Sequence, residues 1–183
     1  AKKGFELAMQ RSKKLCCVDK ANVLETSRLW RETVQAMEKD YPEVTVSYEF
    51  VDAVAMRLVQ WPNSYDVLIT ENLFGDILTD EASVISGSMG LMPSASIGLK
   101  TSLFEPIHGS YPQAAGKDIA NPLATVLSAA MMFEDAFQLK TEAQAIRDVV
   151  NKSLAEGVVT EDLSDGGKSY KTSEVGDWLA AHV

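Results

Sequence analysis

Leu15-Cys-Cys-Val-Asp-Lys20 is a short apolar stretch that ends in two charged residues. An unbroken apolar run at 15–18 indicates a strand buried on both faces, as in a parallel sheet. It contains the only two cysteines of the chain, Cys16 and Cys17. Neighbours on an extended strand point to opposite faces. We therefore expect no disulfide between them and interpret both as reduced thiols.

Helical and strand patterns alternate on either side of this stretch. Before it, Phe5, Ala8 and Met9 share one face of an amphipathic helix. After it, period-two alternation indicates a strand, and apolar residues at helical spacing indicate helices. The expected elements are helix 25–40, strand 44–50, helix 53–61, strand 67–70 and helix 73–86. This order predicts an α/β domain with a substantially parallel sheet.

The pattern changes near residue 88, where we expect a domain boundary. Residues 88–120 are rich in glycine and proline, with two short strands expected at 95–99 and 102–104. Asn121-Pro122 is typical of a helix start, with Asn as the N-cap and Pro at the first helical position. The following helix is apolar nearly all round and is expected to be buried. Two more helices are predicted at 142–155 and 174–181.

Composition excludes several classes of protein. The 183 residues are 46% hydrophobic and 23% charged, which is typical of a globular protein and not of a disordered one. The net charge of −9 disfavours binding to nucleic acid or to an anionic membrane. No apolar run approaches the roughly 20 residues of a membrane span. We expect a cytoplasmic protein with neither partner, although an acidic chain can bind a divalent cation.

Two sets of charged residues follow predicted strands. Lys20 lies at the carboxyl end of its strand, the edge where α/β proteins bind ligands. It can pair with a carboxylated substrate or move a proton, or it is a surface lysine with a neighbouring partner. Asp76 and Asp80 are four residues apart on one helix face, a spacing suited to Mg²⁺ or Mn²⁺. The alternative is one carboxylate favoured by the helix dipole and one solvated acid. Asp52 is either a helix N-cap or a third ligand.

The third candidate is the loop Glu105-Pro-Ile-His-Gly-Ser-Tyr-Pro-Gln-Ala-Ala-Gly116, which runs towards the helix start at Asn121. Such a loop can wrap a nucleotide with its backbone N–H groups. It matches neither a Walker A loop nor the GxGxxG fingerprint. The alternative is an ordered surface loop.

Taken together, these segments resemble the β-decarboxylating dehydrogenases, the family of isocitrate and isopropylmalate dehydrogenases. Order and spacing agree over 18–32, 49–59, 69–98 and 104–132. The resemblance implies the layered sheet-and-helix fold of that family, incomplete here because the chain resembles the C-terminal half. It assigns 1–87 to the dimerisation and metal-binding domain and 88–183 to the cofactor-binding domain.

The resemblance also implies roles for individual residues. Lys20 manages the proton of the substrate hydroxyl, and Asn22 faces the nicotinamide. Asp76 and Asp80 of one subunit bind Mg²⁺ or Mn²⁺ with Asp52 of the other, in a homodimer with shared active sites. The residues that hold the adenosine of NAD are Glu105, His108, Gly109, Ser110 and Asn121.

Gln113 departs from the family pattern. NAD-dependent members typically have an aspartate there, which accepts hydrogen bonds from the adenosine ribose. Glutamine can still form a hydrogen bond but has no charge to repel a 2′-phosphate. Because no Lys-Tyr pair typical of NADP users is present, NAD remains the expected cofactor.

The implied reaction is the NAD-dependent oxidative decarboxylation of 3-isopropylmalate in leucine biosynthesis. Isocitrate, homoisocitrate, tartrate or D-malate are alternative substrates, and a non-catalytic homologous subunit is an alternative role. The family's substrate-binding arginines and its enol-protonating tyrosine are not matched in this sequence. We therefore expect the 183-residue chain to be inactive alone.

Overall fold

The computed structural model describes residues 1–183 as two compact units, Ala1–Ala82 and Ser83–Val183. The division lies within helix α4 (Asn72–Ile85), a few residues before the boundary expected near 88. The roles assigned to 1–87 and 88–183 stay predictions. None of the helices combines the length and the apolar composition that crossing a membrane requires.

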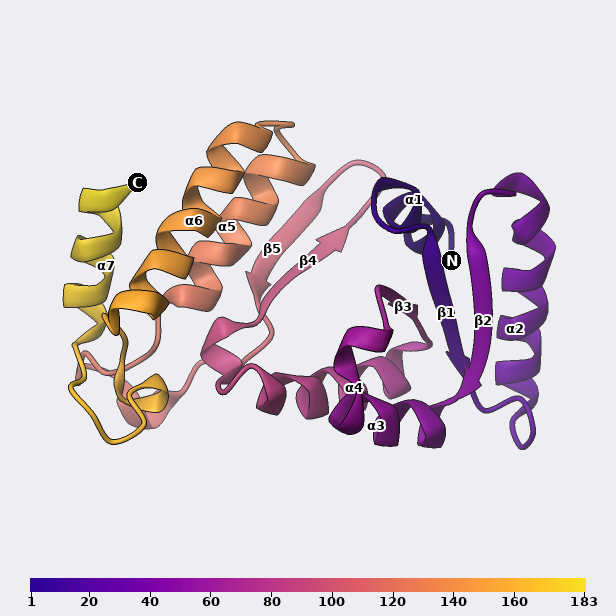
Figure 1. Ribbon diagram of the computed structural model, residues 1–183, viewed down its shortest axis with the longest axis horizontal. Helices are drawn as coiled ribbons and strands as arrows, with labels where there is room; N and C mark the ends of the chain where they lie inside the picture. Colours follow the sequence, from indigo (N-terminus) through magenta and orange to yellow (C-terminus); the bar gives the residue numbers. More distant parts are fainter. The chain divides into compact units, whose positions relative to one another are not determined.

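The first unit is built on a parallel sheet of three strands. β1 (Lys14–Asp19) lies between β2 (Thr45–Phe50) and β3 (Val67–Ile69), and all three run in the same direction (Figure 1). Cys17 pairs with Tyr48 on one side and with Ile69 on the other. The parallel sheet predicted from the alternation of strands and helices is confirmed.

Helices cover both faces of this sheet. Phe5 of α1 (Lys2–Gln10) and Val34 of α2 (Glu25–Met37) belong to the same buried cluster as Cys17. The opposite cluster contains Cys16 with residues of α3 (Val51–Gln60) and α4. The two thiols are therefore free and on opposite faces, as expected. Desolvation by burial raises the pKa of Cys16 to about 11 and that of Cys17 to about 12, so both thiols stay protonated and unreactive.

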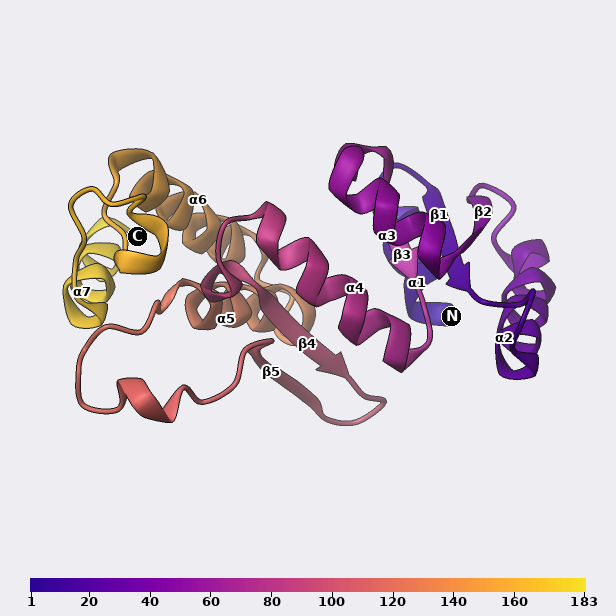
Figure 2. The same cartoon turned by 90° about the horizontal axis from the view of Figure 1, so that it is seen from below.

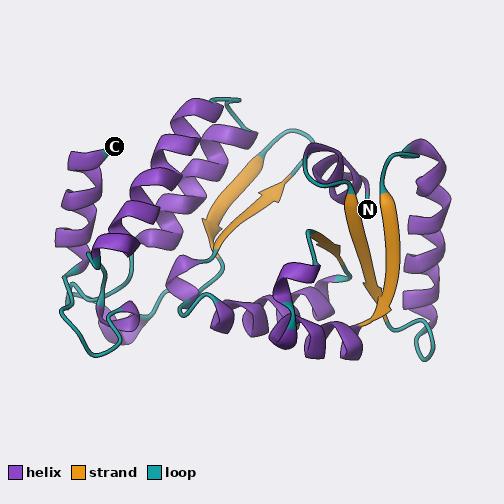
Figure 3. Cartoon of the chain, viewed as in Figure 1, coloured by secondary structure: helices purple, strands orange, loops and turns teal.

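The second unit packs three helices and a β-hairpin. β4 (Pro93–Ile97) and β5 (Ser102–Pro106) are antiparallel, and α5 (Leu123–Asp135) packs against both (Figure 2). α6 (Lys140–Glu156) and α7 (Thr172–His182) follow as further helical layers (Figure 3). The buried core shared by α5, α6 and α7 consists of Leu123, Val149, Val150, Val175 and Leu179. The α/β fold class is confirmed, and the predicted elements differ from the observed ones mainly at their ends.

Short 3₁₀ turns complete the two units. They are η1 (Glu38–Asp40), η2 (Pro62–Ser64), η3 (Met89–Leu91), η4 (Pro112–Ala114) and η5 (Glu161–Leu163). The start of α5 differs by one residue from the expectation, because Pro122 occupies the N-cap position. The predicted capping contact nevertheless forms: the Leu123 N–H donates to Asn121 Oδ1 at 2.9 Å.

A buried ion pair closes the carboxyl end of β1. The Asp19 carboxylate is fully buried and accepts from Arg31 Nε at 2.7 Å and from Arg31 Nη2 at 3.2 Å. It also accepts from the Ala21 N–H at 2.8 Å. The Arg31 guanidinium in turn lies 5.4 Å from the ring centres of Tyr48 and Phe50 on β2. One charge pair therefore ties together the ends of β1 and β2, helix α2 and the loop after β1.

We predict that Asp19→Ala destabilises the complete protein by about 3–5 kcal/mol, because it leaves Arg31 without its buried counter-ion. Chemical denaturation followed by circular dichroism measures this change. The matched control is Glu25→Ala, which removes the carboxylate of the exposed Arg28–Glu25 pair and should change stability little. Equal effects of the two substitutions would contradict the assigned role of Asp19.

Candidate functional site

Lys20 and Asp52 form the first part of the candidate site. Lys20 Nζ lies 2.5 Å from Asp52 Oδ1 and 5.8 Å from the centre of the Phe50 ring. Lys20 directly follows β1, and Asp52 follows β2, so the two side chains meet because parallel neighbouring strands end at the same sheet edge. The sequence separates them by more than thirty residues, and only the strand register brings them together.

Asp52 is not the N-cap of its helix. Phe50 holds that position, and Asp52 lies in the first turn of α3. The hydrogen bond from Lys20 holds the pKa of Asp52 below its usual value, and the backbone at the helix start contributes in the same direction. The N-cap alternative for Asp52 is therefore wrong. Its carboxylate is ionised at neutral pH and mostly exposed, which leaves it able to bind a further cation.

Asp76 and Asp80 lie on α4, with Asp76 in the second helical turn. The first turn of α4 has no acidic residue, so the helix dipole gives little reason for a carboxylate at Asp76. Asp76 Oδ2 accepts from Asn72 Nδ2 at 3.2 Å. Both carboxylates are exposed, and exposed oxygen donors at this spacing fit Mg²⁺ or Mn²⁺ with waters completing the shell.

The three acidic residues do not form one metal site within the chain. No group of three or more side chains of His, Cys, Asp or Glu is close enough to hold an ion. Asp52 is paired with Lys20 instead of joining Asp76 and Asp80. A single chain thus offers two separate donor sets, so their role as ligands of one ion stays a prediction.

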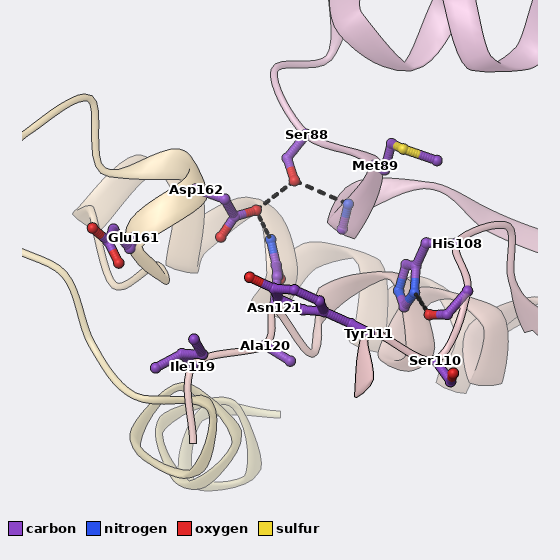
Figure 4. A pocket seen from close by; sticks show the side chains of 12 residues that line it. Ser88, Met89, His108, Ser110, Tyr111, Ile119, Ala120, Asn121, Glu161 and Asp162 are labelled. Atoms are coloured by element: carbon purple, nitrogen blue, oxygen red, sulfur yellow. Dashed lines mark hydrogen bonds between the residues drawn. The ribbon is translucent and has the colours of Figure 1, made fainter. Parts of the chain in front are cut away.

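A cavity of about 610 Å³ lies in the second unit. Four of the predicted cofactor-binding residues line it, namely His108, Gly109, Ser110 and Asn121. Apolar wall is supplied by Met89, Ile119 and Ala120, and Figure 4 shows how these side chains surround the opening. The loop 105–116 and the start of α5 therefore contribute to one concave site.

Asp162 organises one wall of this cavity and was not predicted from the sequence. Its carboxylate accepts from the Ser88 hydroxyl and from Asn121 Nδ2 at 2.9 Å (Figure 4). It also accepts from Thr160 Oγ1 at 2.5 Å. Partial desolvation opposes ionisation, but these three hydrogen bonds outweigh it and hold the pKa of Asp162 below its usual value. The only local signal is Thr160, two residues before Asp162. A threonine at this spacing from an aspartate is too common in proteins to mark a site.

The cavity has features that fit a nucleotide. His108 Nδ1 lies 3.0 Å from the Gly109 carbonyl, whereas His108 Nε2 is buried and has no partner in the chain. A buried polar atom without a partner carries a free-energy cost that a ligand can remove. An apolar wall with a few polar groups that can contact a ligand is typical of small-molecule and cofactor sites.

Three other predicted residues lie outside this cavity lining. Asn22 is an exposed residue in the loop after Lys20, in the first unit. Glu105 is exposed on β5, opposite Ser94. Gln113 is exposed within η4. Their assignment to the cofactor stays a prediction.

Comparisons with known proteins identify the family of the chain. The model of the isocitrate/isopropylmalate dehydrogenase family matches residues 1–179. The chain belongs to this family. A 3-isopropylmalate dehydrogenase from Bacteroides fragilis is 57% identical over 183 residues, covering 100% of this chain and 52% of the relative. A 3-isopropylmalate dehydrogenase from Desulfitobacterium hafniense is 54% identical over 179 residues, covering 97% and 51%.

Solved structures of the isocitrate/isopropylmalate dehydrogenase family share the fold. The isocitrate dehydrogenase from Methylococcus capsulatus aligns with a TM-score of 0.93 at 37% identity, covering 99% of this chain and 54% of that one. An apo β-decarboxylating dehydrogenase from Thermococcus kodakarensis gives a TM-score of 0.88 at 36% identity, covering 99% and 52%. The chain spans about half the length of the relatives it matches.

We predict that Gly90→Ala damages the cavity and that Gly176→Ala, a control outside the cavity, does not. A Cβ at Gly90 would lie 2.6 Å from the Asn121 Cβ, whereas a Cβ at Gly176 would meet nothing within 4 Å. The clash displaces the Asn121 side chain and should cost about 1–3 kcal/mol of stability, as overpacking does. Thermal unfolding and calorimetric titration with ADP-ribose check both substitutions in the complete protein. Equal behaviour would contradict the role of the close approach at Gly90.

Proposed function

We propose that this chain forms part of an NAD- and Mg²⁺- or Mn²⁺-dependent 3-isopropylmalate dehydrogenase of leucine biosynthesis. The reaction oxidises the C2 hydroxyl of 3-isopropylmalate to a ketone and releases the β-carboxyl group, which is attached to C3, as CO₂. The observation that carries the proposal is the placement of Lys20 beside Asp52 at the carboxyl edge of the sheet. The relatives that are 57% and 54% identical bear the name of this enzyme, which favours isopropylmalate over the other 2-hydroxy acids.

Lys20 is the proposed proton acceptor for the substrate hydroxyl. Its side chain is only a quarter exposed, and its Nζ lies 2.5 Å from Asp52 Oδ1. Proton acceptance requires the Lys20 amine to lie beside the substrate hydroxyl. Asp52 holds that amine at the carboxyl edge of the sheet, where parallel α/β proteins bind ligands.

The donor groups of this chain suit the two proposed cofactors. Bound Mg²⁺ or Mn²⁺ supplies Lewis acidity at the substrate hydroxyl, and NAD⁺ supplies the hydride acceptor. Asp76 and Asp80 would hold the metal ion with their exposed carboxylates. The cavity residues His108 and Asn121 would hold the adenosine of NAD.

The active site is proposed to be shared between two copies in a homodimer. Within one chain Asp52 stays apart from Asp76 and Asp80, so a three-carboxylate site needs a second copy. The helices that carry these residues also expose large apolar side chains: Met56, Val59, Leu73, Ile77 and Val84. Apolar side chains exposed on this scale indicate an interface.

We predict that the complete protein forms NADH from 3-isopropylmalate with Mg²⁺, faster than from isocitrate or D-malate. Asp76→Asn should lower kcat/KM by about a hundredfold or more and weaken Mg²⁺ binding, because metal assistance is worth several kcal/mol. Asp40→Asn makes the same charge change on an exposed 3₁₀ turn and is the control. Undiminished turnover by Asp76→Asn would remove the metal assignment, and no turnover by the unaltered protein would remove the proposed activity.

A second prediction concerns the shared site. Lys20→Ala and Asp76→Asn proteins are each inactive in this scheme, but their hybrid dimer retains one site with both residues intact. Mixing equal amounts under subunit exchange should recover up to about a quarter of the original activity. Failure to recover activity after native mass spectrometry has shown hybrid dimers would contradict the sharing.

A further inference from the structure

Tyr111 occupies an unfavourable backbone conformation at the edge of the cavity. Its φ is 45° and its ψ is 61°, which is the left-handed region. Bulky side chains are rare there, whereas glycine and asparagine enter it readily. Pro112 follows, and a residue before proline normally prefers extended backbone. The Ala114 N–H donates to the Tyr111 carbonyl at 3.0 Å, which fixes the turn in this shape.

No side-chain contact of Tyr111 within the chain offsets this backbone strain. The residue is 55% exposed, and its ring stacks on no other aromatic ring of the protein. Its hydroxyl forms no hydrogen bond within the chain, and no lysine or arginine lies over its ring. Tyr170, in contrast, is half-buried and has Lys168 4.3 Å from its ring centre. Strained residues that persist without internal compensation cluster at ligand-binding sites.

The surroundings of Tyr111 identify the kind of ligand. It lines the same cavity as Met89, Ile119 and the unpartnered His108 Nε2. An exposed aromatic face in a cavity with apolar lining suits a flat, uncharged ring that carries polar atoms at its edge. Stacking of a nucleobase on such a face is a strong contribution to nucleotide binding.

We propose that Tyr111 provides the stacking face for the adenine ring of the dinucleotide and thereby sets the affinity for the adenosine half of the cofactor. This inference rests on the proposed function, which places NAD in this cavity. Adenine is the ring of NAD that does not react, so a stacking partner can hold it without hindering hydride transfer at the nicotinamide. The strained turn at Tyr111 is retained because it presents the ring to the cavity.

The test is calorimetric titration of the complete protein with ADP-ribose, which contains adenine but no nicotinamide. Tyr111→Ala should weaken ADP-ribose binding about tenfold, and Tyr111→Phe should stay within about threefold, because the ring and not the hydroxyl stacks. Nicotinamide mononucleotide should bind equally to all three proteins. Tyr111→Gly should lose affinity like Tyr111→Ala but unfold at a higher temperature than Tyr111→Ala, since glycine accepts φ 45°.

The outcomes separate this inference from the proposed function. Unchanged ADP-ribose affinity of Tyr111→Ala, in a protein that still forms NADH, overturns the stacking role alone. Equal losses in Tyr111→Phe and Tyr111→Ala also overturn it, because they assign the contact to the hydroxyl. A folded, unaltered protein that binds neither ADP-ribose nor NAD overturns both the cofactor site and the stacking role.

Discussion

The buried carboxylate of Asp19 is the constraint on which the position of Lys20 depends. A charge at the end of a central strand must be paired, and Asp19 is paired with Arg31 and with the Ala21 N–H. The backbone on both sides of Lys20 is thereby held, since Asp19 precedes it and Ala21 follows it. Lys20 is directed towards Asp52 at the end of the neighbouring strand. The geometry of the Lys20–Asp52 pair is therefore set by a second, buried ion pair between Asp19 and Arg31.

The sequence was sufficient for the fold of the first unit because its signals are local. Adjacent cysteines in an apolar run require two opposite buried faces, and the structure places Phe5 against Cys17 and Val54 against Cys16. Apolar residues alone were less reliable. Leu29 has an apolar side chain on α2 but is 66% exposed, because the face of α2 that contacts the sheet is centred on Val34. In the second unit, the strand expected at 95–99 is observed at Pro93–Ile97. Its ends are set by pairing with β5 and not by the β-propensity of its residues.

The candidate site was only partly predictable for a related reason. The family motif indicated Lys20 and Asp52 as functional residues, but their pairing depends on the strand register between β1 and β2. Asp162 lies more than seventy residues from Ser88, and no motif links the two. The strain at Tyr111 has no sequence signature either, because tyrosine before proline normally indicates extended backbone. Interactions between distant segments and unusual dihedral angles are properties of the folded chain.

Asn121 shows how one side chain joins the start of a helix to the cavity of the second unit. Its Oδ1 accepts from the Leu123 N–H at the start of α5, and one hydrogen of its Nδ2 is donated to Asp162. An asparagine amide has two hydrogens on nitrogen, so one remains for a ligand in the cavity. Aspartate would cap the helix but would face the ionised Asp162 with a like charge, and leucine would supply neither contact. Gly90 leaves the space that this side chain fills. The side chain that binds the first N–H of α5 is therefore also a side chain that lines the cavity.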